Sequence, residues 1–164
     1  MKATRSEENK LKVEAQGDRE LVITRSFNAP RELVFKAHSE PELVKRWLLG
    51  PDGWTMPVCE IDFRVGGEYR YVWRQANGSE MGMGGMYKEI DRPAKIAATE
   101  KFDDPWYPGE GYSTITFTEN NGTTAFRNVV RYESKEARDG VLASPMESGM
   151  ITTYDRLDTL LATL

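Results

Sequence analysis

The sequence predicts an α+β fold in which a curved antiparallel sheet wraps around one long C-terminal helix. From Ser144 to Leu164, apolar side chains recur at steps of three and four, which is the spacing of one helical stripe. Between residues 58 and 132, apolar and polar side chains alternate instead, and glycine-containing turn signals interrupt the alternation. Strands joined by tight turns pair antiparallel, so the amphipathic helix is expected to lie across the sheet that they form.

The N-terminal segment allows two interpretations. Residues 1–10 are polar and charged and are expected to fray. Residues 11–15 alternate before a turn signal at 16–18, and residues 20–27 alternate again. Residues 1–17 therefore form either a frayed arm or one side of a hairpin with the first main strand.

Two short helices are predicted after this strand. Asn28 as the cap and Pro30 in the first turn begin one helix, which ends near His38. Residues 39–42 have the pattern of a capping box and begin the second helix, which the turn at 50–53 ends. Two short helices joined by a bend are expected to form a V.

Six strands and a short helix are predicted in the rest of the chain before the long helix. Each strand is an alternating run bounded by turn residues such as Asn77-Gly78. Residues 103–111 are a loop, and Ser134 caps the short helix. The expected strands span 58–63, 68–75, 81–90, 95–102, 112–118 and 124–132, and the short helix spans 135–142.

The long helix is predicted to begin with Ser144 as its cap, Pro145 at the first position and Glu147 closing a capping box. Its leucine-rich end is typical of core. Its beginning contains Met and Gly, which pack more loosely, so this half is expected to face a cavity. The stripe comprises Met146, Met150, Tyr154, Leu157, Leu161 and Leu164.

Length and charge narrow the functional classes. A chain of 164 residues favours a single domain, here residues 1–164. The 22 Lys and Arg residues against 26 Asp and Glu disfavour nucleic acid or an anionic membrane as the partner. One cysteine, Cys59, excludes an internal disulfide and suits a reducing compartment. Because no apolar run approaches the length of a membrane span, the expected location is the cytoplasm.

The sequence offers little for catalysis or metal binding. His38 is the single histidine and is interpreted as a surface or packing residue, and a zinc site needs more His and Cys ligands than the chain contains. The glycine pairs are interpreted as turn and bulge residues, not as phosphate-binding loops. No catalytic residue, metal or cofactor is therefore predicted, and a binding protein is favoured over an enzyme.

Several segments together resemble the START-like (SRPBCC) helix-grip superfamily, which includes the birch-pollen-allergen fold. Within it, the chain is similar to the family of the activator of heat-shock protein 90 ATPase and to calicheamicin-resistance-type proteins. The resemblance implies a curved sheet that grips the long helix around an apolar cavity. The segments that carry it are residues 25–35, 41–47, 59–69 and 132–134, and the ending from Gly149 through residues 154–161.

Large, soft side chains are the predicted wall of such a cavity. Tyr71 and Trp73 share one face of a strand, and a bulge at Gly84-Gly85 is expected to bring Met86 to the same side as Met83. The predicted ligand-binding residues are Trp47, Trp54, Tyr71, Trp73, Met83, Met86, Phe102, Asn128, Met146, Met150 and Tyr154.

Two features keep alternatives open. Asn128 interrupts the apolar face of the last strand, and its amide either orients a ligand or bonds to a neighbouring side chain. Trp106 and Tyr107 lie between two prolines and form a lid, a docking patch or a plug folded into the end of the sheet.

Three functional hypotheses follow. The first is binding of a small apolar or aromatic molecule, such as a lipid or polyketide. The second is a chaperone-interaction module with a protein partner and a role in the stress response. It is weakened because the resemblance covers only the C-terminal half of the heat-shock protein 90 activator. The third is a cyclase or hydrolase that uses the same cavity through carboxylates or tyrosines.

Overall fold

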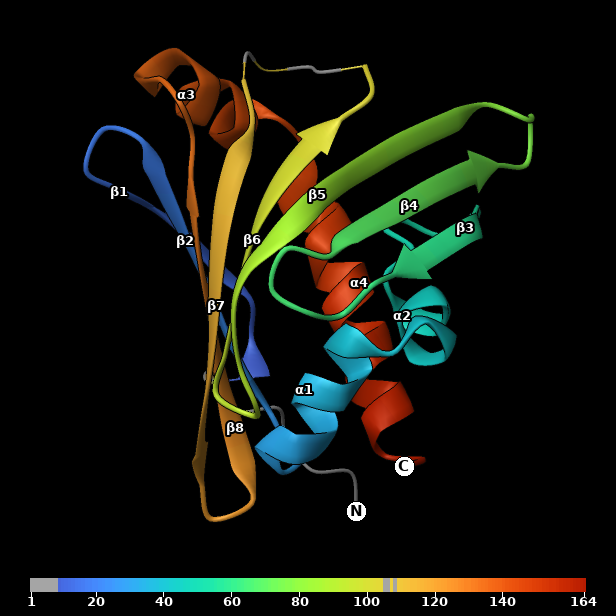
Figure 1. Ribbon diagram of the computed structural model, residues 1–164, viewed down its shortest axis with the longest axis vertical. Coiled ribbons are helices and arrows are strands. Elements are labelled where there is room, and N and C mark those ends of the chain that lie inside the picture. Colours follow the sequence, from blue (N-terminus) through green and yellow to red (C-terminus); the bar gives the residue numbers. More distant parts are fainter. Residues whose placement is uncertain (1–8, 105–106, 108) are drawn as a thin grey trace.

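A computed structural model describes residues 9–104, 107 and 109–164, and it has an α+β layout (Figure 1). The strands are β1 (Lys12–Gln16), β2 (Glu20–Phe27), β3 (Trp54–Ile61), β4 (Glu68–Gln75), β5 (Glu80–Asp91), β6 (Lys95–Phe102), β7 (Gly111–Asn120) and β8 (Thr123–Arg131). The helices are α1 (Arg31–Ser39), α2 (Pro41–Trp47), α3 (Lys135–Ala143) and α4 (Met146–Leu161).

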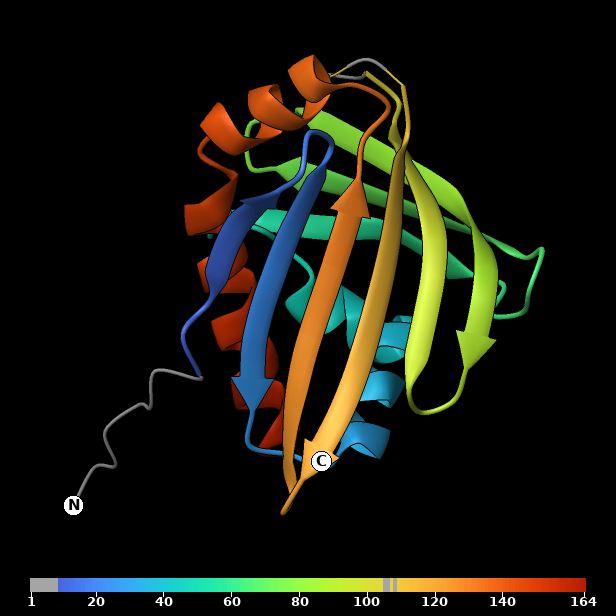
Figure 2. The ribbon, with the colours of Figure 1, turned by 90° about the vertical axis from the view of Figure 1, so that its left-hand side faces the viewer.

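The strands form one curved antiparallel sheet. Their order is β1-β2-β8-β7-β6-β5-β4-β3, so the chain crosses over only where β2 pairs with β8. Helices α1, α2 and α4 lie on the concave side of the sheet (Figure 1), and Figure 2 shows the convex face with these helices behind it. The predicted fold class is confirmed.

The N-terminal alternation corresponds to a hairpin. β1 pairs with β2 from Lys12 opposite Thr24 to Gln16 opposite Glu20. Gly17 has a φ of +57° in the turn, a conformation that glycine adopts without the steric cost of a Cβ. Residues 12–16 are therefore a strand rather than a loose arm, whereas residues 1–8 lie outside the described part.

The predicted strands match the structure closely where turn signals bound them. β4 and β6 have the predicted limits. The turn between β7 and β8 has positive φ at Asn121 and Gly122, as a two-residue hairpin loop requires. β3 begins four residues before the predicted start, at Trp54, and its register against β4 shifts between Thr55 and Val58.

Three of the four predicted helix caps are wrong. Pro30, Glu40 and Pro145 hold the N-cap positions of α1, α2 and α4, without a side-chain cap. The Ser39 and Ser144 hydroxyls instead donate back to carbonyl oxygens of the preceding helix, at Lys36 and Val141. Only Ser134 caps as predicted, accepting from the Ala137 amide at 3.0 Å.

The C-terminal half of α4 is packed into the core. Leu157 and Leu161 are buried, as predicted for the leucine-rich end, but Leu164 follows the helix and is 46% exposed. The buried Arg25 of β2 ties the sheet to the helix, since its guanidinium donates to the Tyr154 carbonyl and to the Asp155 carboxylate, both at 3.1 Å. Packing and hydrogen bonds therefore fix the C-terminal half of α4 against the sheet.

Candidate functional site

An apolar pocket of about 550 Å³ lies between the first half of α4, the segment after α2 and the ends of β4, β5 and β6. It is lined almost entirely by apolar and aromatic side chains. Six of the predicted site residues meet there: Trp54, Trp73, Phe102, Met146, Met150 and Tyr154.

Two local features shape this pocket. The Trp73 indole Nε1 donates to the Leu48 carbonyl at 2.7 Å, which fixes the ring that forms one wall. Gly149 of α4 faces Pro51, where an added Cβ would lie 3.3 Å from the proline Cδ. The glycine thus lets the helix approach the segment after α2 closely while the pocket stays open beside it.

A smaller chamber of about 160 Å³ lies deeper on the concave face of the sheet. Leu48 and Tyr154 line both spaces, so the pocket and the chamber adjoin. The chamber contains the other predicted interior residues, Trp47, Tyr71, Met83 and Asn128, and also His38, Tyr69, Tyr87, Glu100 and Ser113.

Three strands run from the pocket into the chamber. On β4, Trp73 lines the pocket and Tyr71 the chamber, and on β5 Met81 and Met83 divide in the same way. The sheet register places Trp73 opposite Met81 and Tyr71 opposite Met83. On β6, Phe102 lines the pocket and Glu100 the chamber. The two spaces therefore lie end to end along one sheet face.

The chamber is polar where the pocket is not. Asn128 of β8 is buried, and its Oδ1 accepts a hydrogen bond from the Ser113 hydroxyl of β7 at 2.8 Å. The amide thus bonds to a neighbouring side chain, which is one of the two predicted interpretations. Because Asn128 also lines the chamber, an orienting role for its NH₂ group stays a prediction.

Sequence reasoning missed Glu100. It follows Ile96 and Ala98 and precedes Phe102 at alternate positions, so the pattern itself places it on the interior face. Room for the carboxylate comes from Gly111 on β7, where a Cβ would lie 3.1 Å from Glu100 Oε1. Desolvation by burial raises the pKa of Glu100 to about 7.

His38 is a packing residue, partly buried among aromatic rings on the interior side of the sheet. Its ring stacks on Phe126 and meets Trp47 and Phe117 edge-on. Nδ1 lies 2.8 Å from the Val34 carbonyl, which can only accept, so this nitrogen carries the proton. Desolvation lowers the pKa of His38 to about 4, and the ring is neutral at neutral pH.

Tyrosines surround the Glu100 end of the chamber. The Tyr69 hydroxyl donates to the Thr99 carbonyl at 2.7 Å. Tyr107 is 5% exposed and meets Phe102 and Tyr132 edge-on, as in the plug interpretation. Trp106 lies outside the described residues. Burial raises the pKa of each of these tyrosines above its usual value, so they stay neutral.

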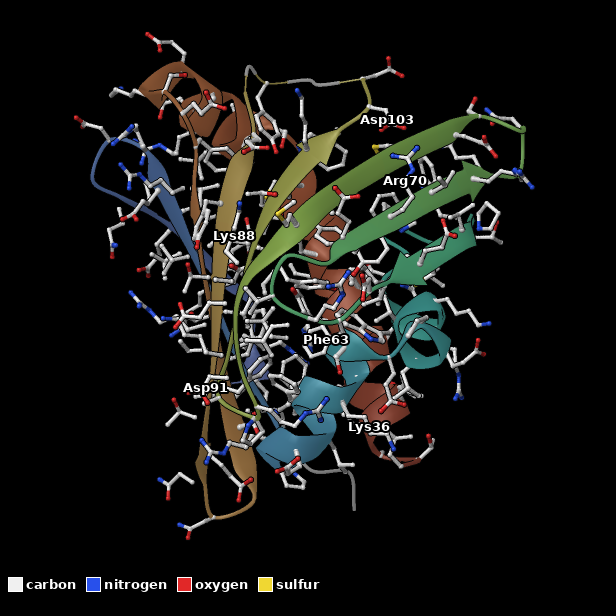
Figure 3. All side chains as sticks on the ribbon, in the orientation of Figure 1. Lys36, Phe63, Arg70, Lys88, Asp91 and Asp103 are labelled. Atoms are coloured by element: carbon white, nitrogen blue, oxygen red, sulfur yellow. The ribbon has the colours of Figure 1, made fainter. Side chains whose placement is uncertain are left out.

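The predicted placement of Met86 is wrong. The register irregularity lies between Tyr87 and Glu89, beyond Gly84-Gly85, so the strict alternation continues and Met86 points away from Met83. Met86 lines a groove of about 660 Å³ on the other face of β4–β6. Charged side chains border that groove, including Arg70, which pairs with Asp103 at its end (Figure 3). Such a surface suits an apolar ligand poorly.

Metal and membrane features can be assessed for the described part of the chain. Within residues 9–104, 107 and 109–164, no group of three or more His, Cys, Asp and Glu side chains is arranged to hold a metal ion. Across the same residues, none of the helices has the length and apolar character needed to span a bilayer.

Comparison with known proteins gives one family and many structures. The model of the family described as activator of Hsp90 ATPase homolog 1-like protein matches residues 28–162. A Rhodobacter sphaeroides protein is 30% identical, with a TM-score of 0.89 over 94% of this chain and 99% of its own. One from Chromobacterium violaceum is 28% identical, with a TM-score of 0.75 over 87% and 96%. One from Mycobacterium smegmatis is 25% identical, with a TM-score of 0.81 over 92% and 95%. No curated protein matches the chain.

Proposed function

The chain belongs to the activator of Hsp90 ATPase homolog 1-like family, and on that premise we propose that it binds a small apolar or aromatic molecule in the pocket and chamber. The observation that carries the proposal is the apolar pocket of about 550 Å³. Ligand sites in proteins usually have volumes of roughly 300–1,000 Å³ and mostly apolar walls.

The open space argues for a ligand because protein interiors are normally close-packed. Trp54, Trp73 and Met150 lose packing partners on the side that faces the pocket, which costs dispersion energy. An apolar molecule in that space would restore these contacts and remove its own surface from water. Methionine side chains in the wall adapt to ligands of different outline.

The test is titration with neutral aromatics such as biphenyl and 2-propylnaphthalene. Micromolar or tighter binding is expected, with a rise in melting temperature by mass action and a change in tryptophan fluorescence from Trp54 and Trp73. If neither compound binds at its solubility limit, by calorimetry or by thermal shift, the proposal is wrong.

Glu100 favours a second candidate, a hydrolase or cyclase. A partly buried carboxyl whose pKa is raised to about 7 matches the working pH of a general acid or base. The two functions differ in the fate of the ligand. Recovery of bound compounds unchanged, as judged by mass spectrometry after long incubation, supports binding alone, and conversion supports catalysis.

A further inference from the structure

We propose that the ligand of this cavity is a cationic amphiphile, an apolar or aromatic body that carries an amine, and that Glu100 binds the ammonium group in the chamber. This inference rests on the proposed function and names the chemistry of its ligand. It is derived from the charges of the lining residues, the partners of Glu100 and the layout of the two spaces.

Among the described lining residues, Glu100 is the one ionisable group that carries charge near neutral pH. Neither Lys nor Arg is among the described residues that line the pocket or the chamber. His38 is neutral, and its protonated Nδ1 is held by the Val34 carbonyl. The carboxylate of Glu100 therefore sets the sign of the cavity, and the complementary ligand charge is positive.

Glu100 has no side-chain partner in the described part of the chain. Among residues 9–104, 107 and 109–164, no side chain forms a hydrogen bond or an ion pair with its carboxylate. The buried Arg25 is bound to Asp155 and to backbone carbonyls. Glu100 is only partly buried, but its carboxylate has no donor among the described residues of the chamber, and an ammonium group would supply both hydrogen bonds and opposite charge.

Aromatic rings surround the same site. The ring centroids of Tyr69 and Tyr71 are 4.9 Å apart, and those of Tyr69 and Tyr87 are 5.5 Å apart. All three tyrosines line the chamber with Glu100. The faces of such rings attract cations, and their contribution grows when water is excluded. They attract neutral groups less strongly, and they offer nothing to an anion.

The layout of the two spaces matches the two parts of such a ligand. Glu100 stands two residues from Phe102 on the same face of β6, so the carboxylate lies directly beyond the pocket wall. The 550 Å³ pocket suits a bicyclic apolar body, and the 160 Å³ chamber suits a short amine-bearing chain. The amine of the ligand would lie in the chamber against Glu100, and its apolar body would fill the pocket.

The tyrosines and the histidine around Glu100 keep a constant charge near pH 8. Those that face it are Tyr69 from β4, Tyr107 from the loop before β7, Tyr132 after β8 and Tyr154 from α4. Tyr71, Tyr87 and His38 line the same chamber, and Glu110 lies near Tyr69. Burial keeps the tyrosines protonated and His38 neutral, so measurements at pH 8 report on an ionised Glu100.

The experiment compares three naphthalene ligands at pH 8 by calorimetry. They are the cation 2-(2-naphthyl)ethylamine, its neutral analogue 2-propylnaphthalene, and the carboxylate anion 2-naphthaleneacetate. The amine should bind at least about tenfold more tightly than the neutral analogue, which is the effect of one charge-assisted contact in a desolvated site. The acetate should bind most weakly.

Two variants assign the preference to its residue. Glu100→Gln keeps the shape of the side chain but removes its charge, so the preference for the amine over the neutral analogue should fall to within about a factor of three. Glu68→Gln is the matched control, because this exposed residue of β4 lies on the outer groove. It should bind all three ligands like the original protein.

The outcomes separate the two proposals. If the neutral analogue binds but the amine binds equally or more weakly, the amine inference is wrong and the proposed function stands. If Glu100→Gln keeps the full preference for the amine, Glu100 is not its binding group and the inference is also wrong. If none of the three binds, the proposed function fails and the inference fails with it. The comparison on the original protein requires no variant to fold.

Discussion

A single interior carboxylate gives this protein a pH-dependent stability. The pKa of Glu100 rises from its ordinary value of 4.5 to about 7 on folding, so the folded state holds this proton more tightly than the unfolded state. Stability from this group is therefore greatest at acidic pH, declines as pH rises from about 4.5 through 7, and then levels off. The total loss is roughly 3 kcal/mol at most.

Glu100→Gln removes this ionisation. Relative to the original protein, the variant should gain up to roughly 3 kcal/mol in free energy of unfolding at pH 8 compared with pH 4.5. Urea unfolding at several pH values measures the difference, and Glu68→Gln on the outer face should follow the original protein. Parallel pH profiles for Glu100→Gln and the original protein would show that Glu100 ionises normally in the fold.

Individual residues also show why site prediction from the sequence is incomplete. Alternation along β6 places Glu100 on the same face as Ala98 and Phe102, but charged side chains in strands usually face solvent, so residue type and alternation point in opposite directions here. The prediction for Met86 is wrong because a glycine pair resembles a bulge, whereas the sheet register shifts between Tyr87 and Glu89. Tertiary packing decides both cases.

At the scale of elements, turns were more predictable than caps. Asn121-Gly122 needs backbone conformations that few other residues adopt, so its signal is local and the hairpin follows. The hydroxyls of Ser39 and Ser144 can bond to either the next helix or the previous one, and the sequence does not determine which. The difference in packing between the two halves of α4 could be predicted from the sequence, because the first half contains Met and Gly and the second half is rich in Leu.

That change predicts unequal effects of truncation along α4. Leu161 is buried in the core, so Leu161→Ala should cost about 2–5 kcal/mol. Met150 is partly buried and borders the pocket, so its side chain already lacks contacts on one side. Met150→Ala should therefore cost about 1 kcal/mol or less and should change the affinity for neutral aromatics.

Urea unfolding of both variants tests this difference, provided that the slope with denaturant stays unchanged. Equal and large losses at both positions would mean that the whole stripe is core. Met150 would then be fully packed, and the binding proposal would lose the support that it takes from open space beside α4.

On the scale of the whole molecule, the sheet and the second half of α4 form a rigid frame, and the pocket lies at one side of it. Hydrogen bonds from Arg25 to Tyr154 and Asp155 hold this frame together, as does the buried side chain of Leu157. The segment from Met146 to Met150 instead borders open space and touches the chain after α2 at Pro51. Regions with fewer buried contacts open at lower free energy.

Hydrogen exchange should therefore divide the molecule into two parts. Without ligand, amides of residues 150–153 are expected to exchange faster than those of residues 156–160, although both sets form helical hydrogen bonds. A bound aromatic should slow exchange at 150–153 and at 48–51, because it restores the missing contacts on the pocket side. The β7–β8 turn lies outside the pocket lining and should exchange at the same rate with and without ligand. Uniform protection along α4, or a ligand effect as large at the β7–β8 turn as at the pocket, would contradict a binding site confined to this side of the frame.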